Sequence, residues 1–237
     1  MTSENTIPKL TLYRMSGSCA LVSHAILHEL DLPFTAIPMT INASVRVESV
    51  DGTISPEQYF AIHPAGQVPA LAVTPPDDPS TTTIITENPA IITYVASLPS
   101  NPTLLGTNAI ERAQIHSWLS FLSGSVHGQA YGALWRPRRY VDGEAHPEAE
   151  EWVRQAGRKN VERFYGMIEE RLPGDGFAVG GRLSVADFNL YLFWRWGVDL
   201  GLEMGRWKNW EAVARGIEGR EAVRRCLDVE GLKVVFV

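Results

Sequence analysis

The pattern of hydrophobic residues changes abruptly near the middle of the chain, and this change constrains the fold more than any other feature. The first hundred residues alternate strand-like and helix-like stretches, whereas from residue 108 onward the pattern is helical throughout. The change falls in the proline-containing segment LPSNPTLLG. We therefore predict an α/β domain over residues 1–99, a linker over 100–107 and an all-helical domain over 108–237.

The first half predicts the element order βαβαββα. Pro38 interrupts the second predicted strand and cannot donate a ladder hydrogen bond, so this strand is expected at a sheet edge. Ser55 followed by Pro56 predicts a helix start, because serine caps helices well and proline suits the first helical position. The expected strands are KLTLYRM (9–15), FTAIPMTI (34–41) and a hairpin of QVPALAV (67–73) with TTIITE (82–87); the expected helices are residues 19–30, 55–62 and 88–98.

The helical half carries one well-defined helix start and one two-sided helix. Ser184 and Asp187 form a capping-box pattern, with Leu183 and Phe188 at the two hydrophobic-staple positions. Between residues 108 and 128, helical spacing separates a buried face from a polar one. The expected core residues are Ile115, Trp118, Leu119, Leu122 and Val126, and the polar stripe is His116, Ser120, Ser123 and His127. The stripe fits either a solvent-exposed surface or the lining of a cleft.

Charge and cysteine content exclude several classes of function. A formal net charge of −6 argues against nucleic-acid or anionic-membrane partners, and the short basic run RPRR (136–139) reads as a solvated surface. No apolar run approaches the roughly 18 residues of a membrane span. Two cysteines are too few for a disulfide framework, and the polar start MTSENTIP lacks the pattern of a secretory signal. We expect a reduced, cytoplasmic protein without a metal.

Cys19 lies in a small-residue turn, MSGSC, between the first predicted strand and helix. Unpaired backbone N–H groups and the positive end of the helix dipole favour an anion there, either the Cys19 thiolate or a ligand thiolate beside it. A packing role is the alternative, because free cysteines are often small core residues. The chain has no C-x-x-C pair, which disfavours thioredoxin-like disulfide exchange. Cys226, in AVRRCL, is expected to fill the core.

Six segments in this order resemble the cytosolic glutathione S-transferases, and within that family the bacterial beta class. They are LYRMSGSCALVSH, HPAGQVPAL, ITENPAIITYVA, WLSFLSGSVHG, VGGRLSVADFNLYLF and LDVEGL. The long hairpin insert VTPPDDPSTTT is closest in style to fungal members. The resemblance covers nearly the whole chain. It implies a thioredoxin-like N-terminal domain, an all-α C-terminal domain, a homodimer and a glutathione site between the domains.

The resemblance assigns the thiol chemistry to two adjacent residues. Cys19 matches the catalytic cysteine of the beta class, while Ser18 is the alternative hydroxyl donor to a glutathione thiolate. Val68 and Pro69 would form a cis peptide bond, at a cost of only about 0.5 to 1 kcal/mol, so that the Val68 backbone pairs with the cysteinyl part of glutathione. Gln67, in the same motif, is a further glutathione-binding candidate.

The γ-glutamyl end of glutathione is assigned to the TEN segment. Glu87 and Asn88 would hold it at a helix start, which favours a carboxylate. Asn88 also suits an N-cap and Pro89 the first helical position, so capping and ligand binding remain inseparable. His127 matches the beta-class histidine that completes the glutathione set.

Four positions depart from the beta-class pattern. Arg14 stands where an aromatic residue is expected, Ala65 replaces a common lysine, Ser120 replaces an asparagine, and Gly128 replaces a basic residue. These departures weaken a simple transfer of glutathione binding to this chain.

A second substrate is expected against the helical domain. Tyr131, Trp135 and Tyr140 follow the polar stripe and form either an aromatic wall for that substrate or a packing cluster. His116 and Ser120 are the polar candidates for the same site.

Three functions follow from the resemblance. Addition of the glutathione thiolate to a small hydrophobic electrophile gives a stable conjugate. Addition to a conjugated alkene, bond rotation and loss of the thiol give cis/trans isomerisation; this reaction, or a pathway-specific conjugation in fungal secondary metabolism, is the alternative. A non-catalytic binding or regulatory module is the third.

Overall fold

The computed structural model describes residues 7–100, 102–142, 146–174 and 176–236. The chain divides into two compact units, Met1–Leu105 with Ile217–Val237 and Gly106–Gly216. The break after Leu105 falls inside the linker expected over 100–107. The sequence pattern predicts a helical domain over 108–237, but Ile217–Val237 belong to the first unit. The reason is that helix α9 (Glu221–Glu230) packs on helix α1 (Ala20–Glu29) of that unit.

A five-stranded sheet forms the centre of the first unit. Strand β1 (Lys9–Arg14) runs parallel to β2 (Thr35–Ile41) and antiparallel to β4 (Ala70–Thr74), which pairs with β5 (Thr83–Thr86) as the predicted hairpin. The strand order is β3-β2-β1-β4-β5.

The prediction of β2 as an edge strand is wrong. The sequence pattern missed the short strand β3 (Val47–Ser49), which pairs only with Met39–Ile41, beyond the proline. Pro38 is tolerated inside the sheet because the pairing of β2 with β3 begins only at Met39, so Pro38 needs no N–H donor on that side. Its carbonyl accepts a hydrogen bond from Val50 N.

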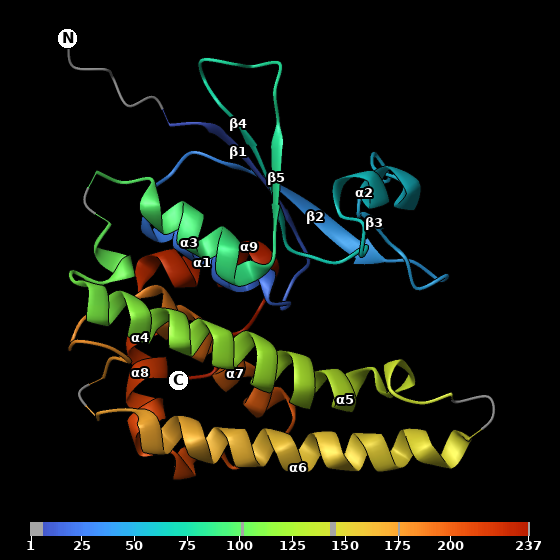
Figure 1. The fold of residues 1–237 in the computed structure, drawn as a ribbon, viewed down its shortest axis with the longest axis vertical. Coiled ribbons are helices and arrows are strands. Elements are labelled where there is room, and N and C mark those ends of the chain that lie inside the picture. The colour runs from blue at the N-terminus through green and yellow to red at the C-terminus, as the bar shows by residue number, and fades with distance from the viewer. Residues whose placement is uncertain (1–6, 101, 143–145, 175, 237) are drawn as a thin grey trace. The chain divides into compact units, whose positions relative to one another are not determined.

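Helices cover both faces of this sheet. Helices α1, α3 (Asn88–Ser97) and α9 lie together on one side, whereas α2 (Pro56–Ile62) lies beside β3 (Figure 1). Leu12 is fully buried, and the neighbouring Tyr13 packs in a separate cluster with Tyr59 of α2 and Met39. Alternate strand residues face opposite sides, so one sheet supports two apolar layers, each large buried side chain contributing about 2 kcal/mol.

The second unit is helical, as predicted. It contains α4 (Ala109–Ser120), a π-helical stretch (Phe121–Tyr131), α5 (Gly132–Trp135), α6 (Pro147–Arg171), α7 (Val185–Asp199) and α8 (Lys208–Glu218), the last ending just beyond the boundary of the unit. Helix α7 is central, because all of its residues from 185 to 197 are buried. The five predicted core residues of α4 and the π-helical stretch are also buried, at 2 % exposure or less.

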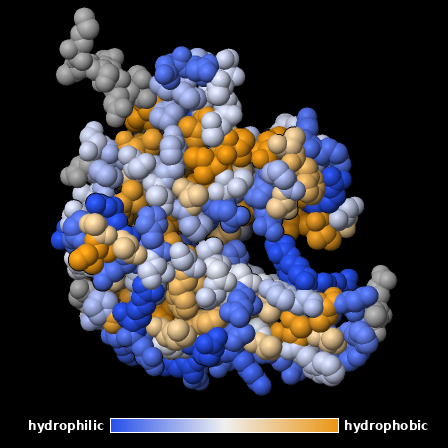
Figure 2. All heavy atoms as spheres, viewed as in Figure 1, coloured by the Kyte–Doolittle hydropathy of each residue, from blue (hydrophilic) through white to orange (hydrophobic). Residues whose placement is uncertain are grey.

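Short 3₁₀ turns connect the larger elements, at Thr103–Leu105, Pro137–Arg139 and Met204–Arg206. The side of α6 that is visible in Figure 2 is mainly hydrophilic, which fits a helix that covers the unit from outside. Within the described ranges, none of the helices combines the length and apolar character that crossing a bilayer requires.

Candidate functional site

The turn between β1 and α1 presents the residues expected to carry the chemistry. Cys19 is the N-cap residue of α1, as predicted, and its side chain makes no capping hydrogen bond. Its Sγ lies 3.5 Å from the carbonyl oxygen of Val68, toward which the thiol donates. Both Ser18 and Cys19 are partly exposed. The structure therefore brings Cys19 next to the QVP motif.

The expectation that the backbone N–H groups of this turn remain unpaired is wrong for most of them. Ser18 N donates to Met15 O at 3.2 Å, and Leu21 N donates to Ser18 O at 3.0 Å. Ala20 N donates to the Ser18 side-chain oxygen at 3.2 Å, and Gly17 N donates to the carboxylate of Glu230 at 2.9 Å. Any stabilisation of an anion here depends on the helix dipole and on side chains more than on these amides.

The adjacent loop supplies the second part of the site. The Val68–Pro69 bond is cis, as predicted. The loop begins at Gly66, whose φ of +59° suits glycine and where an added Cβ would lie 2.8 Å from Phe60. The carbonyl of Gln67 accepts a hydrogen bond of 2.6 Å from the hydroxyl of Tyr59. Burial is the main reason that the pKa of Tyr59 is raised, so this hydroxyl stays protonated and holds the loop in place.

The TEN segment differs in detail from the prediction. Glu87, not Asn88, is the N-cap of α3, and its φ of +68° lies in the left-handed region that a non-glycine residue rarely adopts. Asn88 is buried, and its Oδ1 accepts a 2.5 Å hydrogen bond from Ser23 of α1. Asn88 therefore ties α3 to α1, while the exposed Glu87 is held in a strained conformation of the kind that often marks a binding site.

His127 lies in the π-helical stretch of the second unit. Its ring packs against Trp196, with centroids 5.2 Å apart, and against Phe193 at 6.3 Å. Burial, followed by the positive charges of Arg136 and Arg139, lowers the pKa of His127 to about 4. The imidazole is therefore neutral near pH 7, and the contacts described above are with aromatic rings.

The other residues of the polar stripe are not brought together with His127. His116 and Ser120 are exposed on α4, whereas His127 is partly buried. The spacing argument assumed 3.6 residues per turn, and the π-helical stretch that begins at Phe121 breaks that period.

The expected aromatic wall is only partly correct. Tyr131 is fully buried and shares a 2.5 Å hydrogen bond with the hydroxyl of Tyr165, so it is a core residue. Trp135 is 47 % exposed, and its ring packs on Trp196 with centroids 4.7 Å apart. Tyr140 is exposed, and its hydroxyl donates to the carbonyl of Gly128 at 3.0 Å. An accessible aromatic surface therefore remains at Trp135 and Tyr140.

Two family models match the chain along most of its length. The N-terminal domain of glutathione S-transferases matches residues 17–98, and the C-terminal domain matches residues 118–215. The chain belongs to the glutathione S-transferase family. The order of the two matches agrees with the α/β and helical units described above.

Individual family members match over long stretches. The chain is 29% identical to the glutathione S-transferase GstA of Escherichia coli O157:H7, with 94% of this chain and 100% of the relative covered. It is 30% identical to a glutathione S-transferase-like protein of Aspergillus aculeatus, covering 76% and 82%. A sphingomonad glutathione S-transferase solved in complex with glutathione superposes with a TM-score of 0.74 at 28% identity, covering 94% of this chain and 100% of that one.

The expected likeness to fungal glutathione S-transferases is not supported. The bacterial relative matches nearly all of this chain, whereas the fungal relative leaves about a quarter of it unmatched. The hairpin insert between β4 and β5 that suggested fungal members is a surface loop, and such loops vary in length among homologues.

The structure explains Arg14, one of the four departures from the beta-class pattern. Arg14 is 6 % exposed, and its Nη1 lies 3.9 Å from Oε1 of Glu230 in the last helix. Arg14 therefore compensates a buried carboxylate, a role that no local pattern around residue 14 indicates. Ala65, by contrast, is exposed, and its N–H donates to the ring of His63 at 3.2 Å.

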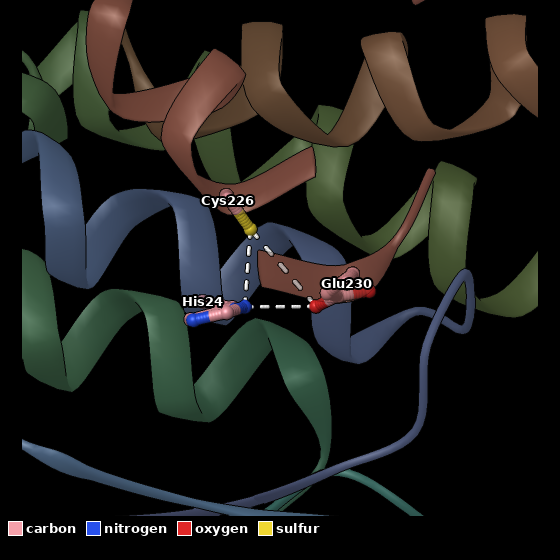
Figure 3. Close-up of side chains that lie close together, drawn as sticks. All are labelled: His24, Cys226 and Glu230. Atoms are coloured by element: carbon pink, nitrogen blue, oxygen red, sulfur yellow. Dashed lines mark hydrogen bonds and ion pairs between the residues drawn. The ribbon is translucent and has the colours of Figure 1, made fainter. Parts of the chain in front are cut away.

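Sequence analysis missed the cluster around Glu230. His24 Nδ1 lies 2.8 Å from Glu230 Oε1 and 3.1 Å from Cys226 Sγ, and the three side chains converge between α1 and α9 (Figure 3). Cys226 is fully buried, as expected, but it packs against polar partners. The LDVEGL motif was the available signal, and only the fold shows what its glutamate contacts.

Proposed function

We propose that this protein is a glutathione transferase that activates the glutathione thiol beside Cys19. The observation that carries the proposal is the placement of the Cys19 thiol at the start of α1, 3.5 Å from the Val68 carbonyl. A hydrogen bond from Cys19 and the positive end of the helix dipole would both favour the glutathione thiolate. The thiol proton would pass to solvent, and the sulfur would then form a C–S bond to an electrophilic carbon, either expelling a leaving group such as a halide or opening a conjugated double bond, whose carbon then takes up a proton from solvent.

Cys19 suits this role better than Ser18 does. The Ser18 hydroxyl donates to Met15 O at 2.7 Å and accepts a hydrogen bond from Ala20 N at 3.2 Å. Its proton is thus already used to close the turn. The Cys19 thiol is a weak donor, so a bound ligand can replace its 3.5 Å contact to Val68 O at less cost.

The remaining glutathione contacts are proposed at Val68, Gln67, Glu87 and Asn88. The exposed carboxylate of Glu87 suits the γ-glutamyl ammonium group, and its strained backbone supports a binding role. Asn88 Oδ1 is occupied by Ser23, so Asn88 would contribute its amide N–H groups. His127 is retained as a candidate neutral hydrogen-bonding partner.

The second substrate is proposed to be a small hydrophobic electrophile that contacts the aromatic surface at Trp135. Exposed tryptophan rings offer apolar area with one polar edge, which suits an uncharged organic molecule. Conjugation and cis/trans isomerisation share the same thiolate addition and differ in whether the adduct persists. A conjugated alkene offered as substrate distinguishes them, because isomerisation regenerates free glutathione.

Capture on immobilised glutathione, followed by a thiol-conjugation assay with a chromogenic aryl halide, tests the proposal. The wild-type protein is expected to bind and turn over, and Cys19→Ala is expected to raise the pKa of bound glutathione by about one to two units, because it removes one hydrogen bond to a charged group. Cys19→Ser should retain part of the effect.

Ser18→Ala is the matched control for the conjugation assay. If it abolishes turnover while Cys19→Ala behaves as wild type, the role belongs to Ser18. If the wild-type protein neither binds nor turns over glutathione, the non-catalytic alternative is correct. The homodimer and the cytoplasmic location also remain predictions, the first of which is checked by light scattering in solution.

A further inference from the structure

The last helix of the chain holds the turn that carries Cys19. Glu230, the final residue of α9, accepts the Gly17 N–H on its side-chain Oε2 at 2.9 Å. Its backbone carbonyl accepts the Ser16 hydroxyl at 2.6 Å. One residue therefore contacts two consecutive residues of the turn, although it lies more than 200 positions away in the sequence.

The Glu230 carboxylate is itself held in place. Its side chain is 0 % exposed, with the guanidinium of Arg14 at 3.9 Å. Its other oxygen, Oε1, lies 2.8 Å from Nδ1 of His24. A buried charge costs several kcal/mol unless it is paired and hydrogen-bonded. Arg14 therefore compensates the charge of the Glu230 carboxylate, and Gly17 N–H and His24 Nδ1 are hydrogen-bond partners of its two oxygens.

The second ring nitrogen of His24 contacts another histidine. His24 Nε2 lies 3.2 Å from Nε2 of His28. Burial, followed by the charges of His24, Arg225 and Arg14, lowers the pKa of His28 to about 4, so His28 is neutral near pH 7. With His28 Nε2 as the donor to His24 Nε2, the hydrogen of a neutral His24 ring lies on Nδ1, facing Glu230.

The ligand atoms of His24, Cys226 and Glu230 lie within 4.8 Å of one another, close enough for a metal ion, but their other contacts favour a structural role. Cys226 Sγ and Glu230 Oε1 both meet the same nitrogen of His24, so the ring cannot relay a proton between them through its two nitrogens (Figure 3). The Arg14 guanidinium already supplies the positive charge that a cation would bring. Arg14 and His24 instead fix the Glu230 carboxylate in the position where it accepts the Gly17 N–H.

We propose that Glu230 is a positioning residue for glutathione activation, holding residues 16–19 in the conformation that places Cys19 beside the substrate sulfur. The inference rests on the proposed function. The first helical N–H, of Ala20, is satisfied locally by the Ser18 side chain, so the contribution of Glu230 is to fix residues 16 and 17, which precede the helix.

The test compares Glu230→Ala with Glu218→Gln. Glu218 is the matched control, because it is also buried in the first unit and accepts two backbone N–H groups, from Val235 and Phe236, away from the turn. Glu230→Ala is expected to lower kcat by about ten- to a hundredfold, the value of one hydrogen bond to a charged group, with the KM for glutathione changed less than about threefold. Glu218→Gln should leave both constants within about twofold.

Hydrogen–deuterium exchange supplies a readout that does not need turnover. In Glu230→Ala the amides of residues 16–19 should exchange at least about tenfold faster, while those of the second half of α1 keep their protection. Glu230→Gln retains a carbonyl acceptor for Gly17 N–H and should restore part of both effects. If the alanine variant does not fold, Ser16→Ala, which removes the second contact, should still lower kcat by about two- to fivefold.

Four results would overturn the inference, and three of them come from the variants described above. These three are a wild-type kcat in Glu230→Ala, an equal loss of kcat in Glu218→Gln, and unchanged amide exchange at residues 16–19 in Glu230→Ala. Stoichiometric Zn²⁺ binding that disappears in Cys226→Ala would also overturn it, by assigning the cluster to a metal. Absence of glutathione turnover in the wild type refutes the proposed function, whereas the exchange experiment decides independently whether Glu230 holds the turn.

Discussion

The first turns of helices α1 and α7 are held in opposite ways. Helix α7 begins with a local capping box, in which Ser184 and Asp187, three residues apart, satisfy each other's groups. Helix α1 begins at Cys19 without a side-chain cap, and its preceding turn is anchored by Glu230 from the far end of the chain. Where the helix start is purely structural, neighbouring residues suffice. At α1 the Ser18 side chain still accepts the Ala20 N–H, but the turn before the helix is held by a residue from the other end of the chain.

The difference also appears in the backbone. Ser184 has the extended conformation of an ordinary N-cap, with φ −143° and ψ 168°, whereas Cys19 is already helical, with φ −60° and ψ −16°. A helical cap residue cannot turn its side chain back onto the first N–H groups. The Cys19 thiol makes no capping hydrogen bond and instead donates to the carbonyl oxygen of Val68, 3.5 Å away.

Asp187→Ala should produce the largest loss of stability. Asp187 is fully buried and accepts hydrogen bonds from Ala178 N at 2.7 Å and from both the N–H and the hydroxyl of Ser184. Leaving these buried donors unpaired should cost about 3 kcal/mol. All seven tryptophans lie in the second unit, so urea unfolding followed by tryptophan fluorescence measures this directly. Asp187→Asn should lower the free energy of unfolding by about half as much. A loss below about 1 kcal/mol in Asp187→Ala would show that the local cap contributes little to stability.

His127 should make the second unit sensitive to acid. Its pKa is about 4 in the folded protein, against 6.5 for an ordinary histidine, so the unfolded chain binds more protons between these values. Stability should therefore fall as the pH drops from 6.5 to 4, by about 2 kcal/mol from this group. The free energy of unfolding, measured with urea at a series of pH values, should fall less steeply between pH 6.5 and 4 in His127→Gln than in the wild type.

The same pH range contains an opposing group in the second unit. Burial raises the pKa of Asp187 to about 6, which favours folding as the pH falls through that value. Comparing wild type with His127→Gln at matched pH cancels this contribution. Parallel pH profiles for the two proteins would contradict the burial of His127 against Trp196 and Phe193.

Ser55→Ala should have a moderate effect that extends the comparison within the first unit. Ser55 caps α2 in a capping box with Gln58, and its side chain accepts the Gln58 N–H at 3.3 Å. Its removal should cost about 1 kcal/mol and accelerate amide exchange over residues 56–62. Ser97→Ala is the control, because the Ser97 hydroxyl only donates to a carbonyl at the end of α3. Equal exchange in both variants would mean that the cap does not stabilise α2.

Cys19→Ala should change stability least, by less than about 0.5 kcal/mol, because no cap is lost and alanine suits a helical backbone. Cys226→Ala is the contrasting variant, since Cys226 is fully buried and its removal should cost about 1 kcal/mol or more. Thermal unfolding of both variants measures the difference. A larger loss for Cys19 than for Cys226 would assign Cys19 a packing role.

The sequence by itself determined the features that depend on neighbouring residues. The capping residues Ser55 and Ser184, the β4–β5 hairpin, the buried face of α4 and the position of Cys19 before α1 all follow from side chains within a few positions of one another. Such features are set by local hydrogen bonds and by the period of the hydrophobic pattern, which a single stretch of sequence displays in full.

Only the tertiary structure decided the features that join distant segments. The burial of Tyr131 depends on helices that the spacing of α4 does not reveal, and the π-helical stretch shifted His116 and Ser120 out of register with His127. Glu230 meets Gly17 only because α9 packs on α1. A hydrogen bond between residues this far apart leaves no periodic trace in the sequence, since its energy depends on the fold that brings the two atoms together.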